Sequence, residues 1–154
     1  MRADTIGAVV KLVQACHSKS IGFIHRDLRT PNILLQDDLR PLIIDWGFAT
    51  RRGGRDQSFK GAAYYLPSNC KDYAAVQVDL QILVRVCYIE MLSRPNQRAF
   101  QMVYSTRDYW ANVEQSDIWQ RHWLKADKLA QARKYDKLAR VLEKLLSPPS
   151  SSSE

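Results

Sequence analysis

The segment that most constrains how this chain can fold is residues 74–92, which are apolar on nearly every side when drawn as a helix. The apolar members are Val76, Val78, Leu80, Ile82, Leu83, Val84, Val86, Cys87, Ile89, Met91 and Leu92. A helix that is apolar all round is a buried one, because a surface helix keeps a polar face. A chain of 154 residues is long enough for one domain with a core. We expect residues 74–92 to lie inside that core.

The flanking segments predict further helices. Apolar residues recur at positions i, i+3 and i+4 in residues 4–18, the pattern of an amphipathic helix. Residues 97–125 have a helical but irregular pattern, and their expected packing anchors are Trp110, Trp119 and Trp123. A leucine-rich stripe predicts a closing helix over residues 127–146.

Other segments predict a small amount of β-structure and a long loop. Two short apolar runs, residues 33–35 and 42–44, flank a turn-like segment and predict a β-hairpin. Residues 45–72 have little periodicity and are predicted to be a long loop, which in a compact domain is usually functional. The Ser/Pro tail, residues 147–154, is expected to be disordered. The predicted fold class is therefore mainly α with a small β-hairpin.

The chain is basic, with a formal net charge of +7, and much of the excess lies in residues 121–144. The cations there are Arg121, Lys125, Lys128, Arg133, Lys134, Lys137, Arg140 and Lys144. The pattern is typical of the solvated face of an amphipathic helix, and we adopt that interpretation. Trp123 and Tyr135 are the only Trp, Tyr or Phe residues among these charges, too few for a single-strand binding platform, so we expect no nucleic-acid partner.

Cysteine usage and hydropathy bear on the compartment. The three cysteines, Cys16, Cys70 and Cys87, are odd in number and widely spaced, so neither a disulfide framework nor a zinc site is expected. A reducing, intracellular compartment fits this usage, and we expect the cytoplasm. The sequence contains no apolar run of about 18 residues, so no membrane-spanning segment is expected.

Two short motifs carry the chemistry. The run His25-Arg26-Asp27-Leu28-Arg29-Thr30-Pro31-Asn32 matches the pattern H-R-D-L-x-x-x-N, and Asp45-Trp46-Gly47 follows at the end of the second predicted strand. Each motif alone is common loop chemistry, but their order, their strand context and the buried helix that follows are hard to obtain by chance. On these residues the chain resembles the eukaryotic protein kinases, with one aromatic residue exchanged in the D-F-G motif. The resemblance covers residues 4–93 well and 94–146 loosely, and it implies the C-terminal lobe of a kinase.

The resemblance implies a role for each of four polar residues. Asp27 would accept or orient the proton of the incoming hydroxyl group, and Arg29 would neutralise charge on the transferring phosphoryl group. Asn32 and Asp45 would supply oxygen ligands to the Mg²⁺ or Mn²⁺ that accompanies ATP. Asp27, Arg29 and Asn32 are thus the candidate catalytic residues, and Asn32 and Asp45 the candidate cofactor and metal ligands.

Four further residues are expected to hold the loops in place. His25 and Trp46 would pack so that the two loops stay in register, and Gly47 would give the backbone freedom beside the metal ligand. Asp79 would hold the backbone of the catalytic loop from below. The alternative for Asp79 is an ordinary acidic residue at the start of a helix.

The resemblance places an activation segment over residues 45–68. Its end, Gly61-Ala62-Ala63-Tyr64-Tyr65-Leu66-Pro67-Ser68, resembles the substrate-docking pattern G-T-x-x-Y-x-A-P-E with one residue deleted. Ala62 replaces the Thr, and Ser68 replaces the final Glu. The buried Glu–Arg ion pair of the family would therefore be lost, and with it a source of rigidity in this loop.

Arg26 resembles the arginine of kinases whose activation segment is ordered by phosphorylation. A guanidinium can hold a phosphate through two parallel charge-assisted hydrogen bonds, and Ser58 stands where the phosphorylated residue is expected. Arg26 and Ser58 are therefore candidate regulatory residues. The alternative is that Ser58 is a plain loop serine and that Arg26 pairs with a local carboxylate such as Asp56.

Only 24 residues precede His25, and they contain neither a Gly-rich phosphate loop nor a V-A-I-K lysine. We therefore expect residues 1–146 to be a partial kinase domain, with the catalytic loop at 25–32, the metal loop at 45–47 and the buried helix at 74–92. The expected partners are a protein substrate and a missing or separate N-terminal lobe. We expect the isolated chain to be inactive.

The expected function is ATP-dependent phosphorylation of protein hydroxyl groups, with Ser/Thr favoured over Tyr as the more populous class. Two alternatives remain. One is a non-catalytic pseudokinase that serves as an interaction module. The other is a small-molecule kinase of the aminoglycoside or choline type. The run Ile44-Asp45-Trp46 is similar to the metal motif of those enzymes. The short segment from Arg51 to Ser68, ending in Tyr-Tyr-Leu-Pro, favours protein docking over the small-molecule alternative.

Overall fold

The computed structural model describes residues 1–54 and 64–147 of the chain. The prediction for Ser58 and the prediction of disorder for residues 148–154 fall outside these residues. Within the described ranges, none of the helices combines the length and the apolar character that crossing a membrane requires.

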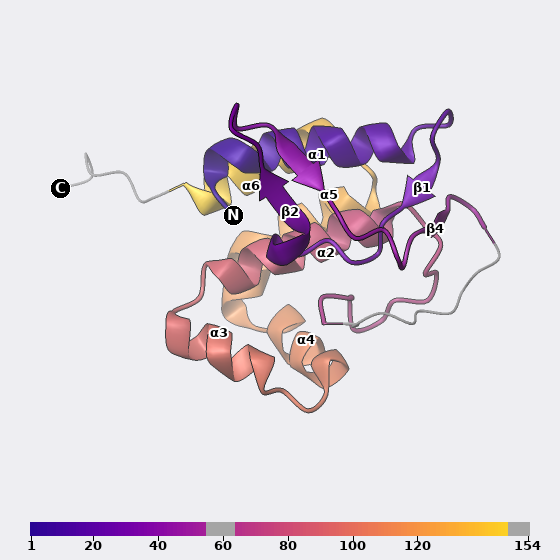
Figure 1. Ribbon diagram of the computed structural model, residues 1–154. Helices are drawn as coiled ribbons and strands as arrows, with labels where there is room; N and C mark the ends of the chain where they lie inside the picture. The colour runs from indigo at the N-terminus through magenta and orange to yellow at the C-terminus, as the bar shows by residue number, and fades with distance from the viewer. Residues whose placement is uncertain (55–63, 148–154) are drawn as a thin grey trace.

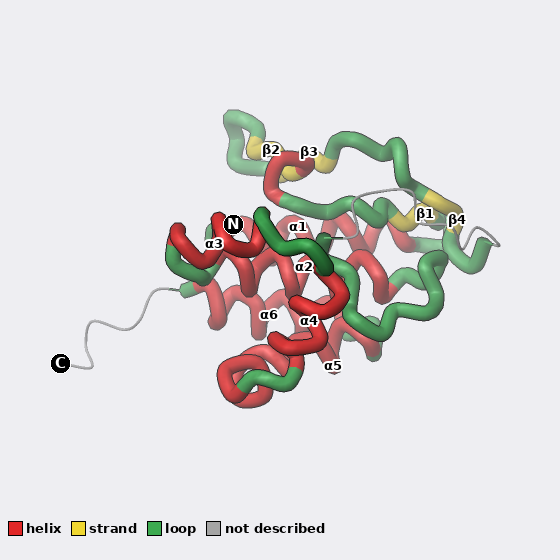
Figure 2. Tube along the Cα trace, turned by 90° about the horizontal axis from the view of Figure 1, so that it is seen from below, coloured by secondary structure: helices red, strands yellow, loops and turns green. Residues whose placement is uncertain are grey.

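Helix α2 (Gln77–Glu90) runs through the middle of the molecule, and residues 78–89 are all buried. Helix α1 (Ala3–His17) packs along α6 (Tyr135–Leu146), and α5 (Leu124–Gln131) packs against α2. Figure 2 shows the strands on one side of α2 and α5 on the other. The mainly α fold class is confirmed, and the predicted buried helix lies at the centre. A helix without a polar face must be covered from several sides, and α2 is covered in this way.

Two small antiparallel sheets lie on the side of the molecule away from α5. Strands β2 (Ile33–Leu35) and β3 (Pro41–Ile43) form the predicted hairpin. Strands β1 (Phe23–Ile24) and β4 (Thr50–Arg51) pair as well, which the sequence pattern did not predict. A two-residue strand is too short to show an alternating pattern. The β1–β4 pair brings the chain before the catalytic motif beside the chain after the metal motif.

In the region after α2, serine residues cap two helices and buried tryptophans pack in the core. Helices α3 (Arg94–Gln101) and α4 (Thr106–Glu114) each begin with a serine whose side chain accepts a backbone hydrogen bond. Pro95 lies in the first turn of α3, where its missing N–H costs nothing. A π-helical turn, η2 (Trp119–Trp123), leads into α5. The predicted anchors are all buried, and they are Trp110, Trp119 and Trp123.

The prediction of one helix over residues 127–146 is wrong in one respect, because α5 and α6 are separate. The break lies at Arg133, whose φ is 58°. The N–H of Arg133 donates to Ala130 O, and the N–H of Lys134 donates to Leu129 O. These two bonds are the Schellman pattern that ends a helix, here with arginine at the left-handed position that glycine usually takes. The break lets each helix turn its own apolar face toward the core.

Candidate active site

The carboxylate of Asp79, in the first turn of α2, is the support on which the site is built. Asp79 is 1% exposed. Its Oδ1 accepts the Arg26 N–H at 2.8 Å, and its Oδ2 accepts the His25 N–H at 2.8 Å. Oδ2 also lies 2.7 Å from His17 Nε2. Arg26 has a φ of 71°, a left-handed conformation that costs a non-glycine residue roughly 1–2 kcal/mol, and the two backbone bonds to Asp79 offset that cost.

The buried His17, at the end of α1, completes the support from the other side. Its Nδ1 lies 2.9 Å from the hydroxyl oxygen of Tyr135, which begins α6. Each imidazole nitrogen therefore has a partner, as burial of a polar ring requires. His17 was not among the predicted site residues. The one sequence signal for His17 was its position in the last turn of a helix, on the same side as the apolar residues.

His25 joins the catalytic loop to the metal loop. Its Nδ1 accepts the Asp27 N–H at 3.0 Å, and its Nε2 donates to Ile44 O at 2.8 Å. A backbone N–H can only donate and a carbonyl can only accept, so the two partners fix the neutral Nε2–H tautomer. The ring of Trp46 packs edge-on against His25 with centroids 4.7 Å apart. His25 and Trp46 thus lie between the two loops, where the resemblance placed them.

The side chain of Asp27 is buried and held by its neighbours in the loop. Asn32 Nδ2 donates to Asp27 O at 2.9 Å and to Asp27 Oδ2 at 3.1 Å. Arg29 Nε lies 3.3 Å from Asp27 Oδ1, close enough for an ion pair but without hydrogen-bond alignment. Arg29 is about one-third exposed, so its charge faces both Asp27 and solvent. The three predicted catalytic residues therefore lie together.

The β2–β3 hairpin brings the two predicted metal ligands side by side. Ile33 pairs with Ile43 in the ladder, and the Ile44 N–H donates to Asn32 O at 2.9 Å. This pairing places Asp45, the next residue, beside the end of the catalytic loop. Asp45 is exposed and has a φ of 62°. The left-handed turn therefore falls on Asp45 itself and not on the glycine that follows it.

The donor set of Asn32 and Asp45 fits a hard divalent cation. Because the amide nitrogen of Asn32 is bonded to Asp27, its carbonyl oxygen is left for another partner. A side chain at Gly47 would begin 3.4 Å from Asp45 Oδ1, so glycine keeps the approach to that carboxylate clear. Among residues 1–54 and 64–147, no three His, Cys, Asp or Glu side chains converge on a metal site. A cation here would draw only two ligands from the chain, as magnesium with a phosphate ligand commonly does.

Arg26 ties together two parts of the loop that follows the metal motif. Its side chain is buried, with Nε donating to Phe48 O at 2.7 Å and Nη1 lying 3.5 Å from Tyr73 O. Ser58 and Asp56, its two predicted partners, both lie outside the described residues. The guanidinium thus connects the start of the predicted activation segment, at Phe48, with Tyr73, which lies just past its end.

The end of the predicted activation segment is held by a buried ion network, which takes the place of the ion pair that was expected to be lost. Ser68 donates through Oγ to Glu114 Oε1 at 2.5 Å and through its N–H to Oε2 at 3.3 Å. Glu114 Oε2 lies 2.6 Å from Arg85 Nη2, and Arg85 Nη1 lies 2.7 Å from Asp127 Oδ1. The carboxylate missing from position 68 is supplied by Glu114 of α4, and the serine binds to it.

Arg85 is the centre of this network, and sequence reasoning missed it. Its side chain is 1% exposed, and its guanidinium lies 5.1 Å from the ring centroid of Trp119 and 5.6 Å from that of Trp110. A buried cation requires paired carboxylates, because desolvation without them is very costly. The signal was present in the sequence, since Arg85 is the one charged residue between Ile82 and Ile89 of this helix.

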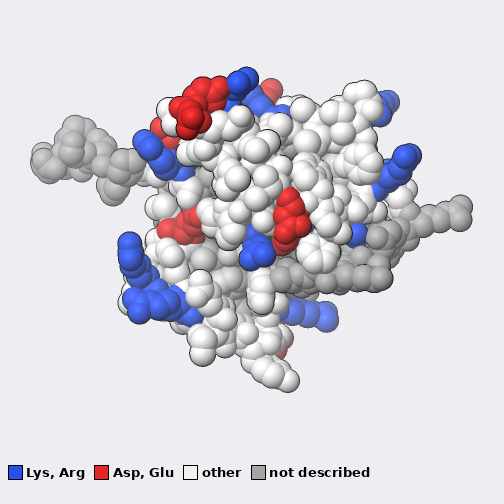
Figure 3. Space-filling model, in the orientation of Figure 1, with Lys and Arg blue, Asp and Glu red and all other residues white. Residues whose placement is uncertain are grey.

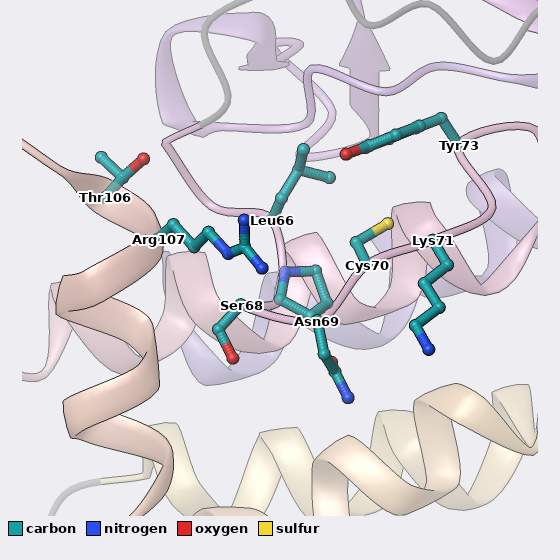
Figure 4. A pocket seen from close by; sticks show the side chains of 9 residues that line it. Leu66, Ser68, Asn69, Cys70, Lys71, Tyr73, Thr106 and Arg107 are labelled. Atoms are coloured by element: carbon teal, nitrogen blue, oxygen red, sulfur yellow. The ribbon is translucent and has the colours of Figure 1, made fainter.

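Two hollows flank the activation segment. One of about 340 Å³ lies between residues 66–73 and the start of α4. Figure 4 shows Arg107 reaching across it from α4 and the Tyr73 hydroxyl pointing toward Leu66. The other, of about 310 Å³, adjoins the catalytic loop and is lined by Arg29, Thr30, Pro31, Tyr64, Tyr65, Phe100 and Gln101.

Comparison with known proteins identifies a matching family. The family model for the protein kinase domain matches residues 2–151. Cysteine-rich receptor-like protein kinases 19 and 18 of Arabidopsis thaliana are 43% identical over 58 residues and 42% identical over 59. A G-type lectin S-receptor-like serine/threonine-protein kinase of the same plant is 39% identical over 59 residues.

These matches cover part of each protein. They span 37%, 38% and 38% of this chain, and 9%, 9% and 7% of the respective relatives. The matching family and the names of these relatives favour a protein kinase over the small-molecule kinases considered from the sequence.

The ion network makes a testable contribution to stability. Glu114→Gln should lower the free energy of unfolding by about 1–3 kcal/mol, because Arg85 loses one carboxylate in a buried setting. It should also speed proteolysis within residues 64–73. The matched control is Asp117→Asn, which removes an exposed ion pair with Arg121 and should cost less than about 1 kcal/mol. Urea unfolding that shows equal losses for the two variants would contradict a supporting role for the network.

Proposed function

Since the chain belongs to the protein kinase family, we propose that it phosphorylates hydroxyl groups of protein substrates with ATP and a divalent metal. ATP supplies the phosphoryl group, and the metal bound with it neutralises phosphate charge. Asp27 takes the proton of the substrate hydroxyl, and Arg29 faces the charge that develops on the phosphoryl group. Asn32 and Asp45 hold the metal through their oxygens.

One observation carries the proposal more than any other. Asp27 is held by Asn32 and Arg29, while the Asn32 carbonyl and the Asp45 carboxylate have no hydrogen-bond donor among the described residues. The loop's own contacts therefore hold Asp27 in place, and no donor from residues 1–54 and 64–147 competes for the Asn32 and Asp45 oxygens. Preorganisation of this kind suits phosphoryl transfer, where positioning and charge stabilisation supply most of the catalysis.

The hollow beside the catalytic loop supports the proposal that the substrate is a protein. Its walls come from the catalytic loop, from Tyr64 and Tyr65 of the activation segment, and from Phe100 of α3. We propose that it receives a substrate side chain next to the acceptor residue. Desolvation raises the pKa of Tyr65, so its phenol stays neutral near physiological pH and offers a hydrogen bond without charge. We propose serine and threonine as acceptors. This choice is supported by the name of one relative, which is a serine/threonine-protein kinase.

The N-terminal lobe that would cover ATP is proposed to come from residues beyond this sequence or from a second chain. The 154 residues contain no Gly-rich phosphate loop ahead of the catalytic loop. We also propose a reducing, intracellular compartment, which is supported by the three cysteines, all of them unpaired.

Metal-nucleotide binding tests the ligand assignment. Mg²⁺ or Mn²⁺ with ATP, at about ten times its Kd, should raise the Tm of the chain by about 3–6 °C, because the ligand binds only the native state. Asp45→Asn should abolish the shift. Asp37→Asn, which alters an exposed aspartate of the β2–β3 turn, should retain it. Equal shifts in all three proteins would show that the metal binds elsewhere.

Phosphotransfer tests the proposed reaction itself. With an N-terminal kinase lobe supplied by fusion, the chain should label a mixed peptide library on serine and threonine. Asp27→Asn should lower the rate by about 10²–10⁴-fold, the usual contribution of a positioned general base. Asp37→Asn again serves as the control. Without the lobe, labelling should stay at background. Robust labelling by the chain alone, or full activity of the Asp27 variant, would refute this assignment.

A further inference from the structure

A second feature of the molecule, on the α5 side of α2, does not belong to the kinase site. It is an open hollow of about 580 Å³ formed by η2, α5 and the first turn of α6. The cations that line it are Arg121, Lys125, Lys128, Lys134 and Lys137. The sequence suggested one helix with a solvated basic face. Instead, the break between α5 and α6 bends that face so that its cations surround a concave surface.

The charge of the hollow is not balanced by the described residues. Of the five cations, Arg121 has an ion pair, with Asp117 at 3.1 Å, and no acidic side chain of residues 1–54 and 64–147 is among those that line the hollow. The nearby Asp127 is buried and bonded to Arg85, so it does not neutralise the surface. The exposed Asp136 follows in the first turn of α6.

The helix geometry brings these like charges together at a cost. Lys125 and Lys128 are three residues apart on α5, and Lys134 and Lys137 are three apart at the start of α6, so each pair lies on one helix face. Lys134 is also the N-cap of α6, where the helix dipole is already positive and an acceptor side chain is preferred. The arrangement disfavours the free chain electrostatically and favours an anionic partner.

The hollow also has apolar lining residues, and these define the partner further. Leu124, Leu129 and Ala132 line it together with the cations. We propose that the hollow binds a short acidic segment of a partner protein in which carboxylates flank apolar side chains. The carboxylates meet the lysines while the apolar side chains cover the leucines, so charge and shape are both complementary.

The other polyanions fit less well. A nucleic-acid strand needs aromatic faces for its bases, and among the described residues no aromatic side chain lines the hollow. A lipid surface is met best by a protruding apolar face, whereas these leucines lie within a concavity. Figure 3 shows the opposite side of the molecule, where one group of basic side chains lies at the lower left and the others lie apart from one another.

The test measures binding of a short fluorescein-labelled peptide of alternating glutamates and leucines to the full 154-residue chain by fluorescence anisotropy. The first variant reverses three charges of the hollow, Lys125→Glu, Lys128→Glu and Lys137→Glu. The control reverses three exposed cations elsewhere, Lys11→Glu, Lys19→Glu and Arg98→Glu, so the net charge of the two variants is equal. Thermal unfolding of both variants checks that they fold. Leu129→Gln, which keeps every charge, probes the apolar lining of the hollow.

We expect the peptide to bind the hollow variant at least tenfold more weakly than wild type, and the control to bind within about twofold. Replacing the peptide leucines with glutamines, or Leu129 with Gln, should weaken binding while the salt dependence between about 50 and 300 mM stays the same. Equal loss in the two triple variants would overturn the proposal, because binding would then follow net charge alone. Tighter binding of a single-stranded oligonucleotide or of phosphatidylserine vesicles than of the peptide would overturn it as well.

Discussion

The arrangement of the site depends on one buried carboxylate. Asp79 lies at the start of the central helix and accepts two successive backbone N–H groups of the catalytic loop while contacting His17. Those bonds hold Arg26 in a left-handed conformation that its side chain disfavours. Without these bonds nothing would offset the free-energy cost of this conformation, and the residues that follow would lose their positions. A helix buried on all sides is the right base for this, because it cannot shift without disturbing the whole core.

Helix α2 carries a second buried charge, that of Arg85, and the two charged residues support different loops. Asp79 holds the catalytic loop, and Arg85 holds the end of the activation segment through Glu114 and Ser68. Between these supports, His25 connects the catalytic loop to Ile44 and so to the metal loop. The predicted catalytic and metal-binding residues are therefore fixed to one rigid element from two directions. This explains how loops with little regular structure can present a defined set of oxygens and cations.

Sequence patterns predicted the parts of the molecule that depend on local order. The apolar character of α2, the β2–β3 hairpin and the two motifs are all properties of contiguous residues. The parts that escaped prediction depend on contacts distant in sequence, such as Glu114 serving Ser68, or on exceptions to a rule, such as Arg133 where glycine is usual. The same exception turned an apparently solvated basic face into a hollow. The positions of Asp27, Asn32 and Asp45 relative to one another likewise needed the structure, since the Asn32–Asp27 hydrogen bonds and the strand register define them.

The most direct test of this account is hydrogen exchange at the amides of His25 and Arg26 in wild type and in Asp79→Asn. An asparagine side chain presents one acceptor and one donor where the carboxylate presents two acceptors, so one backbone N–H must lose its partner. The account predicts that exchange at these amides accelerates at least tenfold, equivalent to about 1.4 kcal/mol, relative to the change seen at Leu142 in α6. Protection of His25 and Arg26 that changes no more than that of Leu142 would contradict it, because the loop would then be held by something other than Asp79.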